Sequence, residues 1–294
     1  MSSRRWKSSA ASTTSSELWI GGIVLAAGLA GCIQTPAPVP VDPPVASETN
    51  DPLARRIAKD VIAVLQEGLD RYDSNVTSYT CTLRKRERID PKGPMAPEQE
   101  MACKFMDKPF SVYADTVRNP LGARKLLYVE GQWDGKMLVQ PTGIAALLGS
   151  VLVDPCGPQA RAETLQCVPQ FGLQRAAEML IRSCQAAREE GILTTTLLGA
   201  GTVGDREVIG YEAKITEPKP TGRFEFPHVR VWLDREWLLP IGVDTWDAEG
   251  IERGHYRYAD VNFKAKLTAD DFLPEANGMK SPKGAPTTRS SEKK

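Results

Sequence analysis

The chain is poor in histidine, with only His228 and His255 among 294 residues, and it carries no net charge. Neither histidine has a second histidine or a cysteine at metal-site spacing, which argues against a zinc centre and a Ser-His-Asp triad. Balanced acidic and basic residues provide no overall field that would attract nucleic acid or an acidic polymer. We therefore expect structural roles for both histidines, no metal, no cofactor and no nucleic-acid partner.

Catalytic motifs are also scarce. Residues 199–204 (GAGTVG) have the glycine spacing of a dinucleotide fingerprint, but no helix follows them, so we predict a turn. The acidic pair Asp270 and Asp271 is better explained as a cap on a final turn, and nothing places Asp244 and Asp247 in a cleft. We predict that the protein is not an enzyme.

No apolar run is long enough to span a bilayer, because a spanning helix needs about 20 apolar residues. Residues 18–30 form a shorter run behind the basic residues Arg4, Arg5 and Lys7, which is typical of an export signal. The run ends in Leu29-Ala30-Gly31-Cys32, which resembles the lipobox of bacterial lipoproteins, where the cysteine thiol is lipidated. We predict an envelope lipoprotein anchored through Cys32 and facing the periplasm; the alternative is an ordinary signal peptide.

The composition divides the chain into four segments. Residues 1–31 are the expected signal peptide, and residues 32–50 form a proline-dense linker that cannot supply the backbone donors of a helix or central strand. Residues 278–294 are poor in apolar side chains and are expected to be disordered. The remaining residues, 51–277, are enough for one domain with a sizeable core, which we expect to be a monomer.

Hydrophobic periodicity predicts an α+β domain. Asp51 and Pro52 start a helix, and a second helix covers residues 172–190. Residues 142–151 are small and apolar and predict a short helix or a flap. Strands with alternating apolar residues follow each helix. After the first helix one strand starts at Val76, a second passes through Met101 and Phe105, and others cover residues 110–117, 124–130 and 136–140. After the second helix the predicted strands cover residues 193–198, 206–215, 223–234, 239–247 and 252–261. The short turns between them indicate one twisted antiparallel sheet with helices on a single face.

Besides Cys32, five cysteines remain. Cys81 and Cys103 lie at matched distances from a hairpin centre, and Cys156 and Cys167 bracket a loop, so either pair could form a disulfide in an exported protein. Buried free thiols are the alternative for both pairs.

Several blocks of sequence resemble known families. Residues 108–113 (KPFSVY), 119–122 (NPLG) and 127–131 (LYVEG) resemble domain-of-unknown-function family 1571 of planctomycete-type envelope proteins. Residues 229–234 (VRVWLD), 256–261 (YRYADV) and 267–272 (LTADDF) are similar to the closing strands of the LolA/LolB lipoprotein carriers and of RseB-type sensors. This resemblance implies a strongly curved antiparallel sheet, an unclosed half-barrel, with helices packed on its concave face.

The same resemblance implies that the concave face receives the acyl chains of a lipid or a lipoprotein. The alternative is that the core is filled and that the domain is a sensor or a protein-interaction module. The expected cavity lining is the apolar set Phe105, Phe110, Val112, Leu126, Tyr128, Trp232 and Trp246, for which plain core packing is the alternative. The charged residues 84–88 (RKRER) would lie near a strand end, where they could touch lipid head groups or block unwanted strand pairing at a solvated edge.

Overall fold

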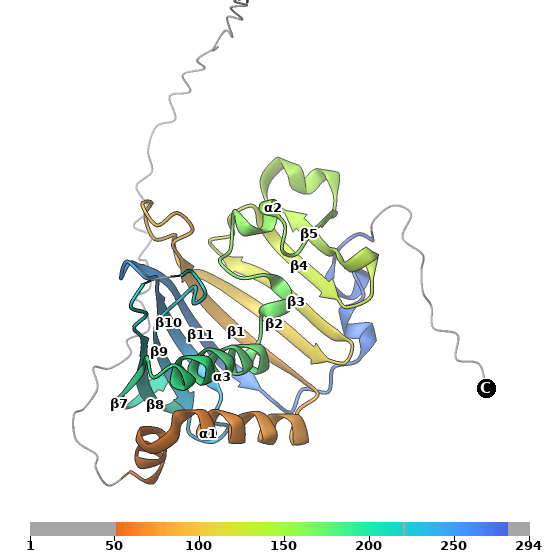
Figure 1. Cartoon of the computed structure of the whole chain (residues 1–294). Helices are drawn as coiled ribbons and strands as arrows, with labels where there is room; N and C mark the ends of the chain where they lie inside the picture. Colours follow the sequence, from red (N-terminus) through yellow and green to blue (C-terminus); the bar gives the residue numbers. More distant parts are fainter. Residues whose placement is uncertain (1–50, 220, 282–294) are drawn as a thin grey trace, which may run out of the picture. The chain divides into compact units, whose positions relative to one another are not determined.

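The computed structural model describes residues 51–219 and 221–281 (Figure 1). The predicted signal, Cys32, the linker and nearly all of the predicted tail lie outside these residues. Within them, no helix combines the length and apolar character needed to cross a membrane. Met279 is buried, so the folded part continues slightly beyond residue 277, the predicted end of the domain.

Eleven antiparallel strands form one sheet in the order β6-β5-β4-β3-β2-β1-β11-β10-β9-β8-β7. Their bounds are β1 Ser78–Glu87, β2 Gln99–Asp107, β3 Phe110–Arg118, β4 Ala123–Val129, β5 Met137–Pro141, β6 Val151–Val153, β7 Leu193–Val203, β8 Arg206–Ile215, β9 His228–Asp234, β10 Pro240–Trp246 and β11 Glu252–Asn262. Two meanders meet where β1 pairs with β11. The sheet is not closed into a barrel, which confirms the predicted α+β half-barrel.

The helices are few and lie mainly on the concave side of the sheet (Figure 1). The α-helices are α1 Pro52–Asn75, α2 Pro158–Arg161 and α3 Leu173–Glu189, and the 3-10 helices are η1 Trp133–Gly135, η2 Gly143–Leu148, η3 Val168–Gln170, η4 Ala269–Phe272 and η5 Glu275–Asn277. Helices α1 and α3 pack on each other and on the β7 to β10 side of the sheet. The main core fills the space between these helices and the sheet.

Helix α1 begins where the sequence predicts. The Asp51 carboxylate accepts hydrogen bonds from the backbone N–H groups of Leu53 (2.8 Å) and Ala54 (3.2 Å). A kink at Asp60, which the apolar periodicity did not predict, interrupts the helix. The Asp60 carboxylate accepts from the N–H groups of Ile62 and Ala63, so it caps the second part of the helix.

The other end of the domain is closed on the convex face. Asp271 accepts a hydrogen bond from the backbone N–H of Thr268 at 2.8 Å, as the predicted cap of the final turn. Phe272 and Met279 then pack against strands β2 to β5 in a small second core.

Two sequence interpretations were wrong. Residues 199–203 are not a turn but the second half of β7, with a register shift between Leu197 and Gly199. The charged residues 84–88 do not lie at an edge, because β1 is the central strand of the sheet and has β2 and β11 as neighbours. Lys85 and Glu87 face the concave side and are buried, at 3% and 4% exposure.

Candidate functional site

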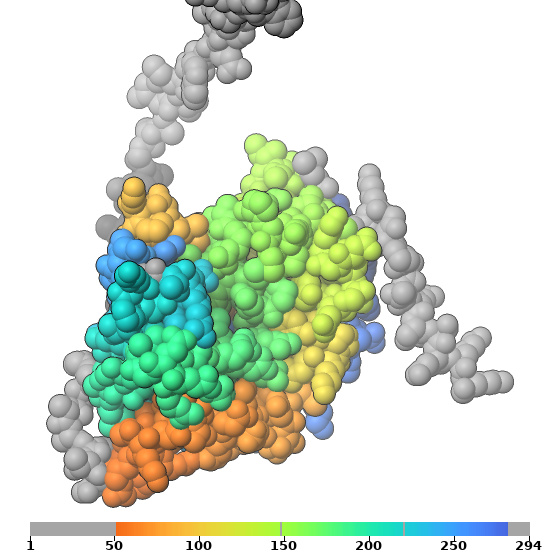
Figure 2. All heavy atoms as spheres, viewed as in Figure 1, coloured from red at the N-terminus to blue at the C-terminus, as the bar shows by residue number. Residues whose placement is uncertain are grey.

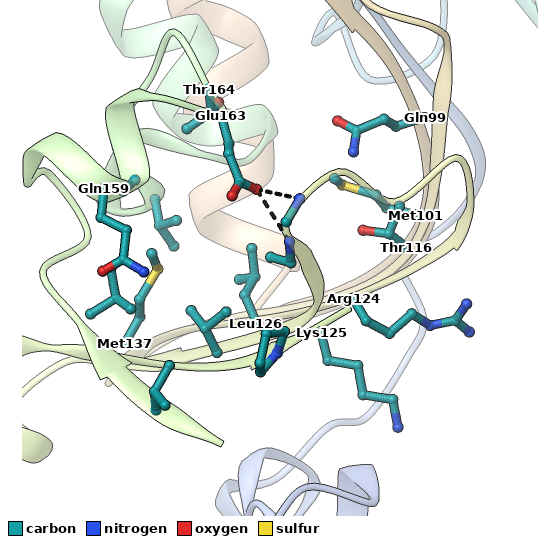
Figure 3. Close-up of a pocket in the computed structure, with 18 of the residues that line it drawn as sticks. Gln99, Met101, Thr116, Arg124, Lys125, Leu126, Met137, Gln159, Glu163 and Thr164 are labelled. Carbon is teal, nitrogen blue, oxygen red and sulfur yellow. Dashed lines mark hydrogen bonds between the residues drawn. The ribbon is translucent and has the colours of Figure 1, made fainter. Parts of the chain in front are cut away.

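A segment that links β6 to α3 crosses the concave face of strands β1 to β5. This segment, residues 157–171, is here named the strap and contains α2 and η3. A disulfide between Cys156 and Cys167 closes most of it into a loop. The Glu163 carboxylate accepts hydrogen bonds from the backbone N–H groups of Gly122 and Ala123, both at 3.2 Å, which ties the strap to the start of β4 (Figure 3).

The strap covers a small cavity of about 110 Å³, here named the strap cavity. Its walls are mainly apolar side chains from β2, β4, β5, β6 and the strap, which include Met101, Leu126, Met137, Val139, Val153 and Phe171. Its polar lining residues include Gln99, Thr116 and Thr164 (Figure 3), and Lys85 also lines it. The volume is below the roughly 150 Å³ of a cavity that holds one benzene ring. The strap cavity is therefore too small for an acyl chain unless the strap moves.

A buried ion pair borders this cavity through Lys85. The Lys85 ammonium lies 2.6 Å from Glu87 Oε2, and both side chains are less than 5% exposed. Thr164 Oγ1 lies 3.3 Å from Lys85 Nζ and 3.2 Å from Glu87 Oε1, and the Leu165 N–H donates to the same carboxylate oxygen. The strap thus supplies part of the polar shell that makes burial of these two charges tolerable.

Tyr256 on β11 also bonds to Glu87. Its hydroxyl donates to Glu87 Oε1 at 2.6 Å. Burial, and next the negative charge of Glu87, raise the pKa of Tyr256 well above its ordinary value, so the phenol stays a donor. A Cβ on Gly254 would lie only 2.7 Å from the Tyr256 ring, so glycine is needed there for the ring to lie across the strand.

A larger cavity of about 340 Å³ lies between α3 and strands β8 to β11, and is here named the helix cavity. It falls within the roughly 300–1,000 Å³ range of small-molecule sites. Helix α3 contributes Leu180 and Cys184 to its inner wall, and the sheet contributes Ala213, Ile215, Val229, Val243, Thr245, Tyr256 and Tyr258. The polar side chains at its rim include Gln166, Gln170, Arg182, Arg223 and Glu225. This arrangement, an apolar interior with a polar mouth, suits an amphiphile.

One polar group inside the helix cavity has no partner. Thr245 is 4% exposed, and its Oγ1 makes no hydrogen bond to any residue that the structure describes. Burying an unpaired hydroxyl costs free energy, so a ligand atom that pairs with it would gain affinity.

Most of the predicted apolar lining lies elsewhere. Phe105, Phe110, Val112 and Tyr128 pack in the main core, and among the seven predicted residues only Leu126 lines either cavity. Tyr79 stacks on Phe105 with ring centroids 4.7 Å apart, which fills that part of the concave face.

Trp232 and Trp246 lie on the face of their strands opposite the helix cavity. Trp232 lies across Gly210 and Gly242 of the neighbouring strands, where a Cβ would meet its ring at 2.3 and 2.9 Å. Trp246 stacks on His228 with ring centroids 4.3 Å apart. Strand alternation explains the difference, because Val231 and Thr245 precede these tryptophans and take the concave positions. The same alternation could have identified Val229, Val243 and Thr245 as cavity residues.

The remaining predicted groups have structural contacts. His228 lies 2.8 Å from Glu212, and His255 lies 2.8 Å from both Asp244 and Glu252. Burial alone would raise the pKa of Asp244, but hydrogen bonds from His255 and Arg257 outweigh it and lower that pKa. In the described ranges no cluster of three or more metal-ligating side chains occurs.

The cysteines separate into two kinds. Cys156 and Cys167 are bonded, whereas Cys81 and Cys103 face each other across β1 and β2 as free buried thiols and not as a disulfide. Cys184 is also free and buried on α3, in the wall of the helix cavity. Burial raises the pKa of Cys81 and of Cys184, which keeps both as protonated thiols.

Comparison with known proteins gives one family match. The model of the family described as "Protein of unknown function (DUF1571)" matches residues 76–280, which confirms the resemblance predicted from the sequence. No curated protein matches the chain.

Solved structures with a similar fold include members of the LolA superfamily and related proteins. MucB is 18% identical with a TM-score of 0.42; the match covers 74% of this chain and 62% of MucB, so the chain spans less than two thirds of that protein. The Mycobacterium tuberculosis lipoprotein LppX is 10% identical (TM-score 0.42; 71% and 99% covered). The LolA superfamily protein NE2245 from Nitrosomonas europaea is 12% identical (TM-score 0.35; 72% and 98% covered).

Proposed function

The chain belongs to the DUF1571 family of proteins of unknown function, and from this premise we propose that it is a membrane-anchored envelope lipoprotein that binds an apolar ligand in its half-barrel. The ligand is a lipid or the acyl chain of another lipoprotein. The observation that carries this proposal is the helix cavity, whose volume of about 340 Å³ suits a small ligand and whose inner wall is largely apolar.

Burial of apolar surface supplies the affinity. A ligand that buries roughly 250 Å² of apolar surface would gain about 6 kcal/mol, from which the entropic cost of association is subtracted. The resulting binding is weak and reversible, which suits a carrier. In this proposal the protein has no catalytic role.

The anchor is the lipidated Cys32, supported by the Leu29-Ala30-Gly31-Cys32 motif after a short apolar run. Residues 1–31 are then the signal peptide, residues 32–50 a tether and the following residues the binding domain. Stable anchoring requires more than one acyl chain, a condition that the several chains of a bacterial lipoprotein anchor would meet. Mass spectrometry of the purified N-terminal peptide tests this part independently of ligand binding.

A cavity-filling variant tests the ligand site. Ala213 is fully buried in the wall of the helix cavity, so Ala213→Phe would occupy the space meant for the ligand. We expect it to abolish the fluorescence gain of a polyene fatty-acid probe that brightens in apolar sites. Ala160→Phe, which fills the strap cavity instead, is the matched control and should leave probe binding intact.

Native mass spectrometry of the delipidated, refolded chain provides a second readout, in which a bound lipid should reappear after exposure to lipid extract. Probe binding that is equal in the wild type and in Ala213→Phe, or absent from both, would exclude the helix cavity as the site. Circular dichroism of each variant shows whether it is folded.

The second candidate function is a sensor or protein-interaction module with a filled core. The strap favours it for the β1 to β6 half of the domain, because a disulfide and the Glu87 network hold the strap over a cavity of only about 110 Å³. Pull-down from envelope extracts separates the two functions, since a carrier captures many lipoproteins weakly and a sensor captures one partner.

A further inference from the structure

The loop between β5 and β6 presents apolar side chains to solvent. Ile144 and Leu147, both in η2, are 87% and 82% exposed, and Val151 and Leu152 of the following strand are each 39% exposed. Fully exposed side chains of this size are normally scattered singly, and two on one short turn beside a half-exposed apolar strand form a patch. We name Ile144, Leu147, Val151 and Leu152 the apolar loop patch.

The loop that carries this patch is uncharged. Residues 137–153 contain no charged side chain, and Asp154 follows β6 at the end away from the loop. Lys280 lies beside the loop, since a Cβ on Gly149 would meet its Cδ at 3.6 Å. An uncharged apolar tip beside the cationic Lys280 is complementary to the acyl region and the anionic head groups of a bilayer.

The patch is also continuous with the strap cavity. Pro141 and Val151, which flank the loop on either side, both line that cavity. An occupant of the patch would therefore lie directly beside the apolar interior of the half-barrel. The figure of the whole chain shows the loop as a projection at one end of the domain, beyond the rest of the sheet (Figures 1 and 2).

We propose that the apolar loop patch inserts into a lipid bilayer and holds the strap side of the half-barrel against the membrane. This contact is made by the folded domain itself and adds to the anchor at Cys32. The insertion is independent of the proposed function, and only the use of the contact in ligand binding rests on that function. The small size of the patch favours a bilayer over a protein partner, because a stable protein interface buries about 800 Å² on each side.

Fluorescent labelling of the full chain in vesicles of phosphatidylethanolamine and phosphatidylglycerol tests the insertion. Ala145→Cys places a reporter between the two exposed apolar side chains. Among the described residues the free thiols, Cys81, Cys103 and Cys184, are buried and do not compete for the label, and the thiol of Cys32 is acylated in the proposed lipoprotein. Thr195→Cys, exposed on the edge strand β7, is the control. We expect the label at 145 to shift to the blue and to be quenched by nitroxide lipids, and the label at 195 to do neither.

Adding Ile144→Gln and Leu147→Gln to Ala145→Cys should return both signals to the level of the control at 195. Probe binding in the helix cavity should be unchanged in this variant, so failure of insertion and failure of the proposed function are read separately. Equal signals at 145 and 195 in vesicles would overturn the proposal. So would shielding of the label at 145 only in envelope membranes that contain protein, which would assign the patch to a protein partner.

Discussion

Tyr256 and Glu87 meet between the two cavities, where the tyrosine hydroxyl donates to Glu87 Oε1 at 2.6 Å. Tyr256 lines the helix cavity, and Lys85, bonded to Glu87, lines the strap cavity. The ion pair and its tyrosine are therefore a polar partition inside an otherwise apolar half-barrel. Removal of Glu87 would leave the Lys85 ammonium without its counter-charge and the Tyr256 hydroxyl without its acceptor.

The first prediction concerns the charge of Glu87. Glu87→Gln keeps the shape of the side chain but leaves the Lys85 ammonium buried without a counter-charge, so we expect a loss of about 3–5 kcal/mol in the free energy of unfolding. Urea denaturation measures it. Replacement of the whole pair, as Lys85→Met with Glu87→Leu, should cost less than Glu87→Gln alone. If the double replacement costs as much as Lys85→Met and Glu87→Leu measured singly and added together, the two charges are not coupled.

The second prediction couples Gly254 to Tyr256. Tyr256→Phe removes a hydrogen bond to a charged group and should cost about 1.5–3 kcal/mol of stability. Gly254→Ala displaces the ring, because its Cβ would lie 2.7 Å from Tyr256 Cε2. In that background we expect Tyr256→Phe to cost less than half as much. A double-mutant cycle by denaturation gives the coupling, and additive effects would show that the glycine does not serve the tyrosine.

The third prediction concerns the strap disulfide. Cys156 and Cys167 are separated by 11 positions, and a loop of this size corresponds to about 2–3 kcal/mol of stabilisation. Cys156→Ala with Cys167→Ala should lower stability by this amount and speed hydrogen exchange at the Leu165 N–H, which donates to Glu87. Dithiothreitol should destabilise the wild type and leave the double variant unchanged. Unchanged exchange at Leu165 would show that the Glu87 and Glu163 contacts hold the strap without the disulfide.

The fourth prediction is a loss of stability in acid that depends on Glu212. Partial burial raises the pKa of Glu212, but hydrogen bonds from Lys214, His228 and Arg230 outweigh it and lower the pKa to about 2. Because the pKa in the folded state lies below the ordinary value of 4.5, the stabilisation is complete above pH 4.5 and is lost as the pH falls toward 2.

The expected contribution is at most about 3 kcal/mol, and smaller because water screens the half-exposed Lys214 and Arg230. Glu212→Gln should flatten the stability profile between pH 4.5 and 2. Glu207→Gln, on the same strand with a side chain 81% exposed, is the control and should keep the wild-type slope. Equal slopes in all three proteins would assign the acid sensitivity to other carboxylates.

Local signals in the sequence predicted the fold well. The Asp51 cap, the apolar stripe of α3 and the alternation in the strands gave the element order, and short turns gave the antiparallel meanders. The central place of β1 could not be predicted in this way, because it depends on the pairing of β1 with β11, which are separated by most of the domain. The residues 84–88 consequently looked like a solvated edge.

The candidate site was predicted less well, for a reason that lies in residue size. Large aromatic side chains were expected to line the cavity, but on the concave face they fill space, as Phe105 does against Tyr79. The helix cavity exists where small or β-branched residues, such as Ala213 and Val243, occupy the concave positions. Trp232 needs the glycines that stand beside it on both neighbouring strands, Gly210 of β8 and Gly242 of β10.

The fifth prediction asks what the ligand presents to Thr245. Its hydroxyl has no partner among the described residues although the side chain is 4% exposed, so Thr245→Val, which keeps the shape, should stabilise the ligand-free protein by about 1–3 kcal/mol. If the natural ligand carries a polar atom at this depth, the same variant should bind it more weakly than the wild type while binding a pure hydrocarbon more tightly. Thermal unfolding with and without each ligand measures both effects. Tighter binding of every ligand by Thr245→Val would mean that the cavity accepts only acyl chains and that the hydroxyl does not contribute to recognition.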